Sequence, residues 1–218
     1  MIFAMSDLMK SFLYSGESGF LELADEWDQL ASQGITNTPF QTLAYQRAWW
    51  THLRPENSEL LTIAMRSDLG ELLGIGCFLV HDGKIQFNGS MEETDYLDLI
   101  AKVDHVEQVW RTMISHLQDY EPDHWHILDL YNIPEASPSR SILRAIAEEH
   151  NDRFNENIIE VCPAIELPPS FDDYLEMLDS KQRRELNRKL RRAEAADVIT
   201  TIVGPADDLQ TEVDSFLD

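Results

Sequence analysis

Three strand-like runs lie close together in the middle of the chain: Leu60-Leu-Thr-Ile-Ala-Met65, Leu72-Leu-Gly-Ile-Gly-Cys-Phe-Leu-Val80 and Ile85-Gln-Phe-Asn88. Ser67-Asp-Leu-Gly70 joins the first two runs, and His81-Asp-Gly-Lys84 joins the last two. Aspartate and glycine at such positions are typical of tight turns, because glycine adopts left-handed backbone conformations without strain. This stretch therefore predicts a three-stranded antiparallel meander.

Helical and strand-like patterns flank the meander on both sides. The expected elements are a helix over residues 20–31, a helix capped by Thr38 with Pro39 in its first turn, a strand over 95–100, a helix over 103–117, a buried strand over 125–130 and a helix opened by Pro138 that runs to about His150. Antiparallel strands followed by strands that alternate with helices indicate an α/β (α+β) fold, in which a mixed sheet carries helices on its faces. We expect Trp27, Trp50 and Trp125 to be largely buried in its core.

The pair Pro168-Pro169 is the best candidate for a domain boundary. We therefore divide the chain into residues 1–168, an N-terminal domain, and residues 169–218, a basic helix and the start of a second domain. The expected elements around the boundary are a strand over 158–167, a helix over 171–178 capped by Ser170, a strand over 198–203 and an acidic helix from 206.

Composition limits the classes of protein to which this chain can belong. Of its 218 residues 43% are hydrophobic, which supports a sizeable core and argues against general disorder. The net charge of −23 argues against nucleic acid as a partner, because most of the surface would repel phosphates. No segment approaches the roughly 18 consecutive apolar residues of a membrane span. Cys77 and Cys162 have no metal-ligand spacing, so we interpret them as buried thiols in a reducing compartment and expect a cytoplasmic protein.

One segment stands out against this acidic background: Ser180-Lys-Gln-Arg-Arg-Glu-Leu-Asn-Arg-Lys-Leu-Arg-Arg-Ala-Glu194. It holds seven of the seventeen Lys and Arg against two Glu, a net charge of +5, so the remainder of the chain carries −28. The segment contains no Gly or Pro and predicts a helix. At about 100° per residue, one arc of that helix collects Lys181, Arg184, Arg188, Arg191 and Arg192, while Leu186, Leu190 and Ala193 lie opposite.

Two interpretations of this basic arc stay open. It is either a solvated face that pairs with acidic side chains, or an anion-binding site for CoA phosphates, a carboxylated substrate, nucleic acid or a lipid headgroup. Arginine outnumbers lysine five to two in the segment, and its planar guanidinium group suits phosphate and carboxylate. Charge alone does not choose between these ligands.

Carboxylates and histidines within strand-like runs are the other candidates. Asp98 and Asp129 would be costly to bury unpaired, so each either has a structural partner or lines a cleft. With Tyr96 they are our candidates for the polar lining of a substrate-binding site, and no residue is assigned a catalytic role. His124 and His126 would project from one face of a strand, but no third ligand is evident nearby, so we expect a structural or surface role and no metal site.

Several motifs follow one another in an order typical of a known family. They are Thr38-Pro-Phe-Gln41 with Tyr45-Gln-Arg-Ala-Trp-Trp50, Leu72-Leu-Gly-Ile-Gly76, Asp95-Tyr-Leu-Asp98, Leu167-Pro-Pro-Ser-Phe-Asp-Asp-Tyr174 and the basic segment. In this order the chain, from about Trp27 onward, resembles the bacterial GNAT-like acyltransferases of the CelD/BcsL (cellulose biosynthesis protein) family, relatives of the Fem peptidoglycan transferases.

The resemblance implies a GNAT-like mixed sheet and a protein of two lobes, of which this chain is the first half. It also implies N-acyl transfer from acyl-CoA to a small-molecule amine in envelope polysaccharide or peptidoglycan biosynthesis, with the cofactor handled mainly by the second lobe. The sequence departs from that pattern because it holds no Arg/Gln-x-x-Gly-x-Gly/Ala pyrophosphate loop, and its Gly74 and Gly76 lie inside a predicted strand. We therefore expect the main acyl-CoA site to be absent and this chain alone to be inactive. The alternative is a non-catalytic module that binds an anionic partner through the basic helix.

Overall fold

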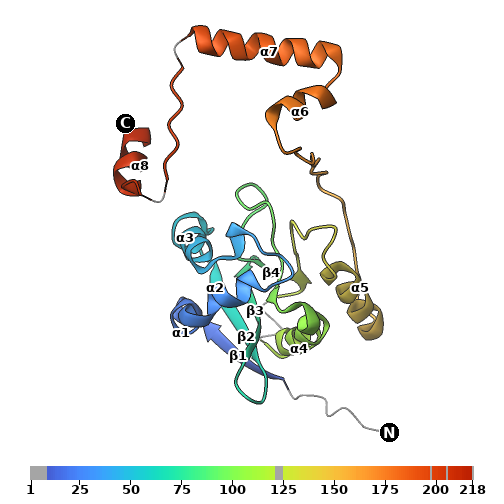
Figure 1. Cartoon of the computed structure of the whole chain (residues 1–218). Coiled ribbons are helices and arrows are strands. Elements are labelled where there is room, and N and C mark those ends of the chain that lie inside the picture. The colour runs from blue at the N-terminus through green and yellow to red at the C-terminus, as the bar shows by residue number, and fades with distance from the viewer. Residues whose placement is uncertain (1–8, 121–124, 197, 205, 218) are drawn as a thin grey trace. The chain divides into compact units, whose positions relative to one another are not determined.

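The computed structural model describes residues 9–120, 125–196, 198–204 and 206–217. By its internal contacts the chain falls into two compact units, Met1–Ile159 and Glu160–Asp218, which are described separately here (Figure 1). The boundary predicted at Pro168-Pro169 lies inside the second unit. The assignment of the two units to successive lobes of an acyltransferase stays a prediction.

A mixed sheet, six-stranded within the described residues, forms the centre of the first unit. Its strands are β1 (Lys10–Ser15), β2 (Glu59–Arg66), β3 (Leu72–His81), β4 (Lys84–Phe87), β5 (Ile100–Ala101) and β6 (Ile127–Leu128). They follow the order β1-β2-β3-β4-β6, and β5 pairs with a part of β3 that β4 does not reach. Among these strands only β4 and β6 pair in parallel, which makes the sheet mixed, as predicted.

The two predicted hairpin turns are confirmed, and the backbone explains their residues. Gly70 has a φ of +85°, and in the second turn Asp82 and Gly83 have φ of +49° and +71°. Two successive residues with positive φ are typical of the type I′ turn, whose twist matches that of the strands it joins. This turn fixes the register of β3 and β4, in which His81 lies opposite Lys84.

Helices cover both faces of the sheet (Figure 1). They are α1 (Ser18–Glu22), α2 (Ala24–Ser32) and α3 (Leu43–Leu53) on one face, and α4 (Val106–Asp119) and α5 (Ser139–His150) on the other. Alternate side chains of β2 serve the two layers, so that Leu61 and Ile63 pack with α4 while Leu60 packs with α1–α3. Trp27 and Trp50 are buried as predicted, whereas Trp125 is only half-buried.

Gly74 and Gly76 allow α4 to pack closely against β3. A Cβ atom on Gly74 would lie 2.6 Å from Val109 Cγ1, and one on Gly76 would lie 2.4 Å from Met113 Sδ. Neither position therefore accepts a side chain unless the neighbouring side chains shift. The strand assignment is confirmed, and helix packing accounts for the glycines that superficially resemble a phosphate loop.

Two strands predicted for the first unit are largely wrong. Only Ile100 of the segment 95–100 lies in a strand, because the backbone before it bonds to side chains and loops: Gln41 Nε2 donates to the Asp98 carbonyl. Residues 125–130 pair only at Ile127–Leu128 and are exposed or half-buried, because β6 has a single neighbour in the sheet. The edge strand β1 was not predicted.

The predicted helices of the first unit form, with changed boundaries. The helix expected over 20–31 is divided at Leu23 into α1 and α2, and the one over 103–117 begins as a 3₁₀ turn, η2 (Val103–His105). Pro39 opens only the 3₁₀ turn η1 (Pro39–Gln41), and the cap of α3 is Thr42, whose Oγ1 accepts from Tyr45 N at 3.3 Å. Thr38 forms no capping hydrogen bond, so that prediction is wrong.

The second unit contains, in its described part, the helices α6 (Phe171–Met177), α7 (Ser180–Ala195) and α8 (Leu209–Leu217). Ser170 caps α6 as predicted, and Asp179 caps α7 in a capping box with Gln182. The strands predicted over 158–167 and 198–203 do not form, because no neighbouring strand pairs with them among the described residues. Cys162 lies in the first of these segments and is exposed, contrary to prediction. No helix of the described residues is long and apolar enough to cross a bilayer.

Candidate functional site

Buried polar side chains meet beside β3, where its pairing changes from β4 to β5. Gln41 ends η1, Gln46 lies on α3, Asn88 follows β4 and Asp98 precedes β5; we call these four residues the polar cluster. Each is at most 4% exposed. Gln41 Nε2 donates to the Asp98 carbonyl at 2.9 Å, while Asn88 Nδ2 donates to Gln46 Oε1 at 2.9 Å and Gln46 Nε2 donates to the Asn88 carbonyl at 3.0 Å. The cluster thus joins segments from three parts of the chain.

Asp98 is the one ionisable member of the polar cluster, and its carboxyl group is held by neutral donors. Its Oδ1 accepts from Leu99 N at 2.7 Å and from Ser139 Oγ at 2.6 Å, and its Oδ2 accepts from Ser137 Oγ. Burial raises the pKa of this carboxyl above its ordinary value, and the hydrogen bonds offset part of the rise. Ser139 Oγ also accepts from Trp110 Nε1 at 2.7 Å, so Asp98 ties its own segment to both α4 and α5.

A small cavity lies against the polar cluster. It is lined by Gln41, Gln46, Cys77, Phe87, Leu97, Asp98 and Ile100, and its volume accessible to water centres is about 10 Å³. That volume holds about one water-sized group. Gln41 Oε1 and Asn88 Oδ1 have no hydrogen-bond partner among the described residues. Burial raises the pKa of the Cys77 thiol to about 12, so this cysteine is not a nucleophile near neutral pH.

Three half-exposed aromatic rings come from the segments that carry the polar cluster. The centroid of the Phe40 ring lies 5.1 Å from that of Tyr45 and 6.4 Å from that of Tyr96. The Tyr45 hydroxyl donates to the Glu93 carbonyl at 2.6 Å, which fixes its ring against the loop before β5. Phe40 and Tyr45 come from the segment of Gln41, and Tyr96 comes from the segment of Asp98. The structure thus places Tyr96 and Asp98, two of the predicted site residues, in one region.

Asp129, the third predicted residue of that site, lies outside the polar cluster. Its Oδ2 accepts from Lys84 Nζ at 2.9 Å and from Tyr131 Oη at 2.7 Å. Burial alone would raise the pKa of the Asp129 carboxyl, but the hydrogen bonds from Lys84 and Tyr131 outweigh it and hold the pKa below its ordinary value. Asp129 therefore has structural partners at the edge of the sheet. Nearby His126 is exposed, and His124 lies outside the described residues.

The basic arc of α7 presents most of its cations without acidic partners. Lys181, Arg184, Arg191 and Arg192 are exposed, and within the described part of the chain none of them pairs with a carboxylate. Arg188 differs because its Nε donates to Glu185 Oε2 at 2.9 Å. Four positive charges on one face are therefore available to an anion.

Arg183 lies outside the basic arc and has a structural role. Its Nε donates to the Leu175 carbonyl at 2.7 Å, and its terminal nitrogen donates to the Leu178 carbonyl at 3.2 Å. These carbonyls are at the C-terminal end of α6, where a helix leaves acceptors unpaired and favours a positive charge. Arg183 thereby fixes α6 against α7.

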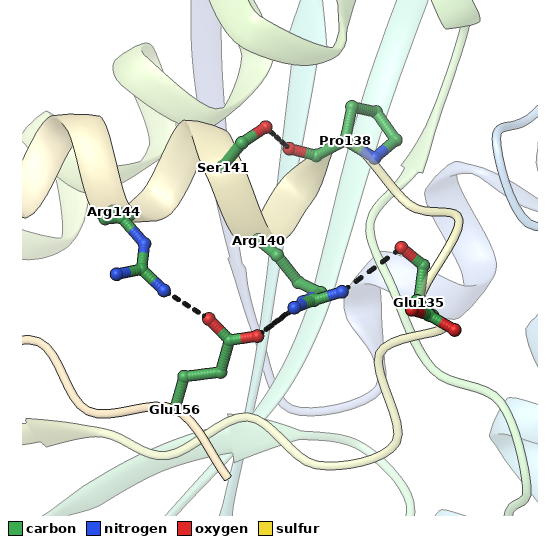
Figure 2. A network of polar contacts seen from close by, with 6 residues as sticks. All are labelled: Glu135, Pro138, Arg140, Ser141, Arg144 and Glu156. Carbon is green, nitrogen blue, oxygen red and sulfur yellow. Dashed lines mark hydrogen bonds and ion pairs between the residues drawn. The ribbon is translucent and has the colours of Figure 1, made fainter. Parts of the chain in front are cut away.

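The segment after α5 is held to that helix by a second polar network (Figure 2). Arg140 Nε and Arg144 each donate to the Glu156 carboxylate, at 2.7 Å and 2.6 Å, and Arg140 also donates to the Glu135 carbonyl at 3.3 Å. The two guanidinium groups hold the pKa of Glu156 below its ordinary value. The network steadies α5 beside Ser137 and Ser139, the serines that bind Asp98.

Comparisons with known proteins identify no family. No family model and no curated protein matches the chain. Among solved structures, it is similar to AAC(6')-Iy in complex with the bisubstrate analogue CoA-S-monomethyl-acetylneamine, with 12% identity, a TM-score of 0.42, and 72% of this chain and 99% of that chain covered. It is also similar to HMB0005, an aminoglycoside acetyltransferase from an uncultured soil metagenomic sample, with 9% identity, a TM-score of 0.41, and 71% and 99% covered. Similarity at this level assigns no activity to this chain.

The described residues do not fit acyl-CoA at the stretch that superficially resembles its phosphate loop. A pyrophosphate is held by backbone N–H groups at the start of a helix. Gly74 and Gly76 instead lie within β3, under α4, and have no space for a ligand group. The basic arc offers charge to phosphates without such a loop.

The sequence does not indicate Gln41, Gln46 and Asn88 as candidates for a site. Residue type does not indicate whether an uncharged amide side chain is buried, because its removal from water depends on the fold. One usable signal was present: Gln41 and Gln46 belong to the first motif of the family resemblance.

Proposed function

We propose that this chain is an N-acyltransferase-like protein that serves transfer from acyl-CoA to an amine acceptor, in envelope polysaccharide or peptidoglycan biosynthesis. One observation carries the proposal, namely that motifs far apart in the sequence meet in the polar cluster. Gln41 and Gln46 come from the first motif and Asp98 from Asp95-Tyr-Leu-Asp98, while Cys77, directly after Leu72-Leu-Gly-Ile-Gly76, lines the same cavity. This convergence supports one shared site rather than separate local features.

The chemistry of this site suits the amine rather than the acyl-CoA. A buried carboxylate, an unpaired amide oxygen and aromatic rings attract a positively charged nitrogen and repel phosphates. Acyl transfer also requires a polarised thioester carbonyl beside the amine. We assign no residue of this chain to that task, and we expect the 218-residue chain alone to be inactive.

A thiol-release assay tests this proposal. Acetyl-CoA and longer acyl-CoAs are incubated with a panel of amines and either the 218-residue chain or a product that includes any coding sequence after Asp218. We expect amine-dependent release of CoA by the longer product only. Release by the short chain would show that it holds a complete acyl-CoA site, and no release by either would remove the acyltransferase proposal.

A second candidate function is a non-catalytic module that binds an anionic partner through the basic arc. The four exposed cations without carboxylate partners favour it. Each charge-assisted hydrogen bond to an anion contributes about 1.5–3 kcal/mol. Because Glu185 already pairs with Arg188, the variant that tests this function is Arg184→Glu with Arg191→Glu.

Binding of CoA and of a polycarboxylate such as citrate is measured for that variant by calorimetry. The matched control is Arg47→Glu with Arg153→Glu, which changes the net charge equally at exposed positions outside α7. We expect the α7 variant to lose binding and the control to keep it. Equal affinity in both variants and in the wild type would show that the basic arc is only a solvated face of α7.

A further inference from the structure

We propose that the cavity between Gln41 and Asp98 is a subsite for a small cation that carries N–H donors, namely the ammonium group of a primary amine. The inference rests on the proposed function only in regarding the molecule that carries this group as the acyl acceptor; the nitrogen that attacks a thioester must first give up a proton, so the ammonium is the bound form and not the reacting one. Binding itself follows from three properties of the polar cluster, which are its buried carboxyl group, its unpaired acceptor and its size.

The first property is a buried carboxyl group without a positively charged partner. Asp98 is 4% exposed, and the donors that hold its carboxyl group, among them the Leu99 amide and the hydroxyls of Ser137 and Ser139, are neutral. No Lys, Arg or His side chain pairs with it within the described part of the chain. A carboxylate removed from water is stabilised by a neighbouring positive charge, and the protein does not supply one.

The second property is a buried acceptor without a donor. Gln41 is 1% exposed, and its Oε1 has no partner among the described residues. The orientation of this amide is set by the Asp98 carbonyl, which accepts from Nε2 and could not accept from an oxygen. Water would supply a donor without charge, and a potassium or sodium ion would supply charge without a donor. An ammonium group supplies both.

The third property is the size of the cavity and the nature of its surroundings. A volume of about 10 Å³ for water centres admits one heavy atom with its hydrogens, so an –NH₃⁺ group fits and a tetraalkylammonium group does not. The segments that provide Gln41 and Asp98 also provide the half-exposed rings of Phe40, Tyr45 and Tyr96.

The test uses methylammonium chloride as the probe and the whole 218-residue chain, at constant ionic strength. Two-dimensional NMR follows the side-chain NH₂ of Gln41 and the backbone amide of Leu99. We expect saturable shifts of both signals with methylammonium, and none with tetramethylammonium or potassium. Asp98→Asn should weaken the affinity at least tenfold, whereas Asp129→Asn, which removes a paired carboxylate outside the cavity, should leave it unchanged.

Gln41→Met provides a second variant if Asp98→Asn fails to fold, and it should also weaken the affinity at least tenfold. Absence of saturable shifts in the wild type would overturn the subsite, as would wild-type affinity in the Asp98 and Gln41 variants or an equal response to potassium. The proposed function and the subsite can each be overturned without the other. Methylammonium binding without acyl transfer by the longer product would overturn the proposed function alone, and acyl transfer without binding at Gln41 would overturn the subsite alone.

Discussion

Asp98 shows how one buried side chain connects elements that the sequence keeps apart. The Leu99 amide and the hydroxyls of Ser137 and Ser139 all point at its carboxylate, and Trp110 joins through Ser139. The loop before β5 and the helices α4 and α5 therefore share one network. At the residue scale, the stability of the first unit and the shape of the candidate site depend on the same group.

Replacing Asp98 by alanine is expected to destabilise the protein. The change leaves a buried amide and two hydroxyls without their acceptor, which lowers the free energy of unfolding by about 2–4 kcal/mol. Urea unfolding of Asp98→Ala measures this loss. The exposed Asp95→Ala is the control and should stay within about 0.5 kcal/mol of the wild type. A loss for Asp98→Ala no larger than that of the control would contradict the network.

The pH dependence of stability provides a second test at this residue. The folded-state pKa of Asp98 lies above its value in the unfolded chain, which is about 3.9, so the folded state holds the proton more tightly. Its contribution to the free energy of unfolding is therefore highest below the unfolded-state pKa and falls as pH rises through the folded-state pKa. The Asp98→Asn variant lacks this decrease in the free energy of unfolding with rising pH. In amine-free buffer, the stability of Asp98→Asn relative to the wild type should rise with pH and then level off; a decline would reverse the predicted shift.

Asp98 is a candidate in the sequence because burying an unpaired carboxylate within an apolar run would be costly. This reasoning uses only the neighbours of Asp98 in the sequence. It could not show that the partners are Ser137 and Ser139, some forty residues later, because only the fold brings them there. The same argument selected Asp129, which the fold pairs with Lys84 at the sheet edge. Residue type thus indicated which side chains need partners, but not which of them share a site.

At the scale of elements, the meander was predictable because side-chain alternation and turn residues act over a few positions. Elements that depend on distant neighbours were not. Residues 158–167 and 198–203 are rich in β-branched residues, as strands are, but have no strand beside them among the described residues. The edge strand β1 forms through its pairing with β2, from Lys10 opposite Arg66 to Ser15 opposite Leu61. Pairing, and not propensity, decided these cases.

The contact between α4 and β3 leads to a prediction about Gly74. A Cβ atom there would lie 2.6 Å from Val109 Cγ1, so Gly74→Ala should lower the free energy of unfolding by about 1–3 kcal/mol. Val109→Ala removes the atoms that clash. In a double-mutant cycle measured by urea unfolding, Gly74→Ala should therefore cost less in the Val109→Ala background than in the wild type. Strictly additive effects would argue against the close contact.

The start of α3 separates two threonines that look equivalent in the sequence. Thr42 Oγ1 accepts from Tyr45 N, whereas Thr38 Oγ1 has no hydrogen-bond partner among the described residues. Thr42→Ala should lower the midpoint of thermal unfolding, with a loss of about 0.5–2 kcal/mol in stability. Thr38→Ala is the matched control and should lose less. A larger loss of stability in Thr38→Ala than in Thr42→Ala would indicate that Thr38 caps the helix, as predicted from the sequence.

At the scale of the molecule, opposite charges are concentrated in different parts of the chain. The polar cluster presents a buried carboxylate, and α7 presents four exposed cations without carboxylate partners in the described residues. A protein that joins an amine to an acyl-CoA requires both kinds of surface, one for a positive ligand and one for a ligand rich in phosphates. Under the proposed function, we expect the amine to bind at the polar cluster and the basic arc to contribute only attraction for phosphates.

Steady-state kinetics of acyl transfer tests this assignment most directly, measured on the product that shows amine-dependent release of CoA. Gln41→Met should raise KM for the amine at least tenfold and leave KM for acyl-CoA within about twofold, because a tenfold change corresponds to about 1.4 kcal/mol, the size of one lost hydrogen bond. Arg184→Glu with Arg191→Glu should raise KM for acyl-CoA and leave that for the amine. An unchanged KM for the amine in Gln41→Met would contradict the central claim.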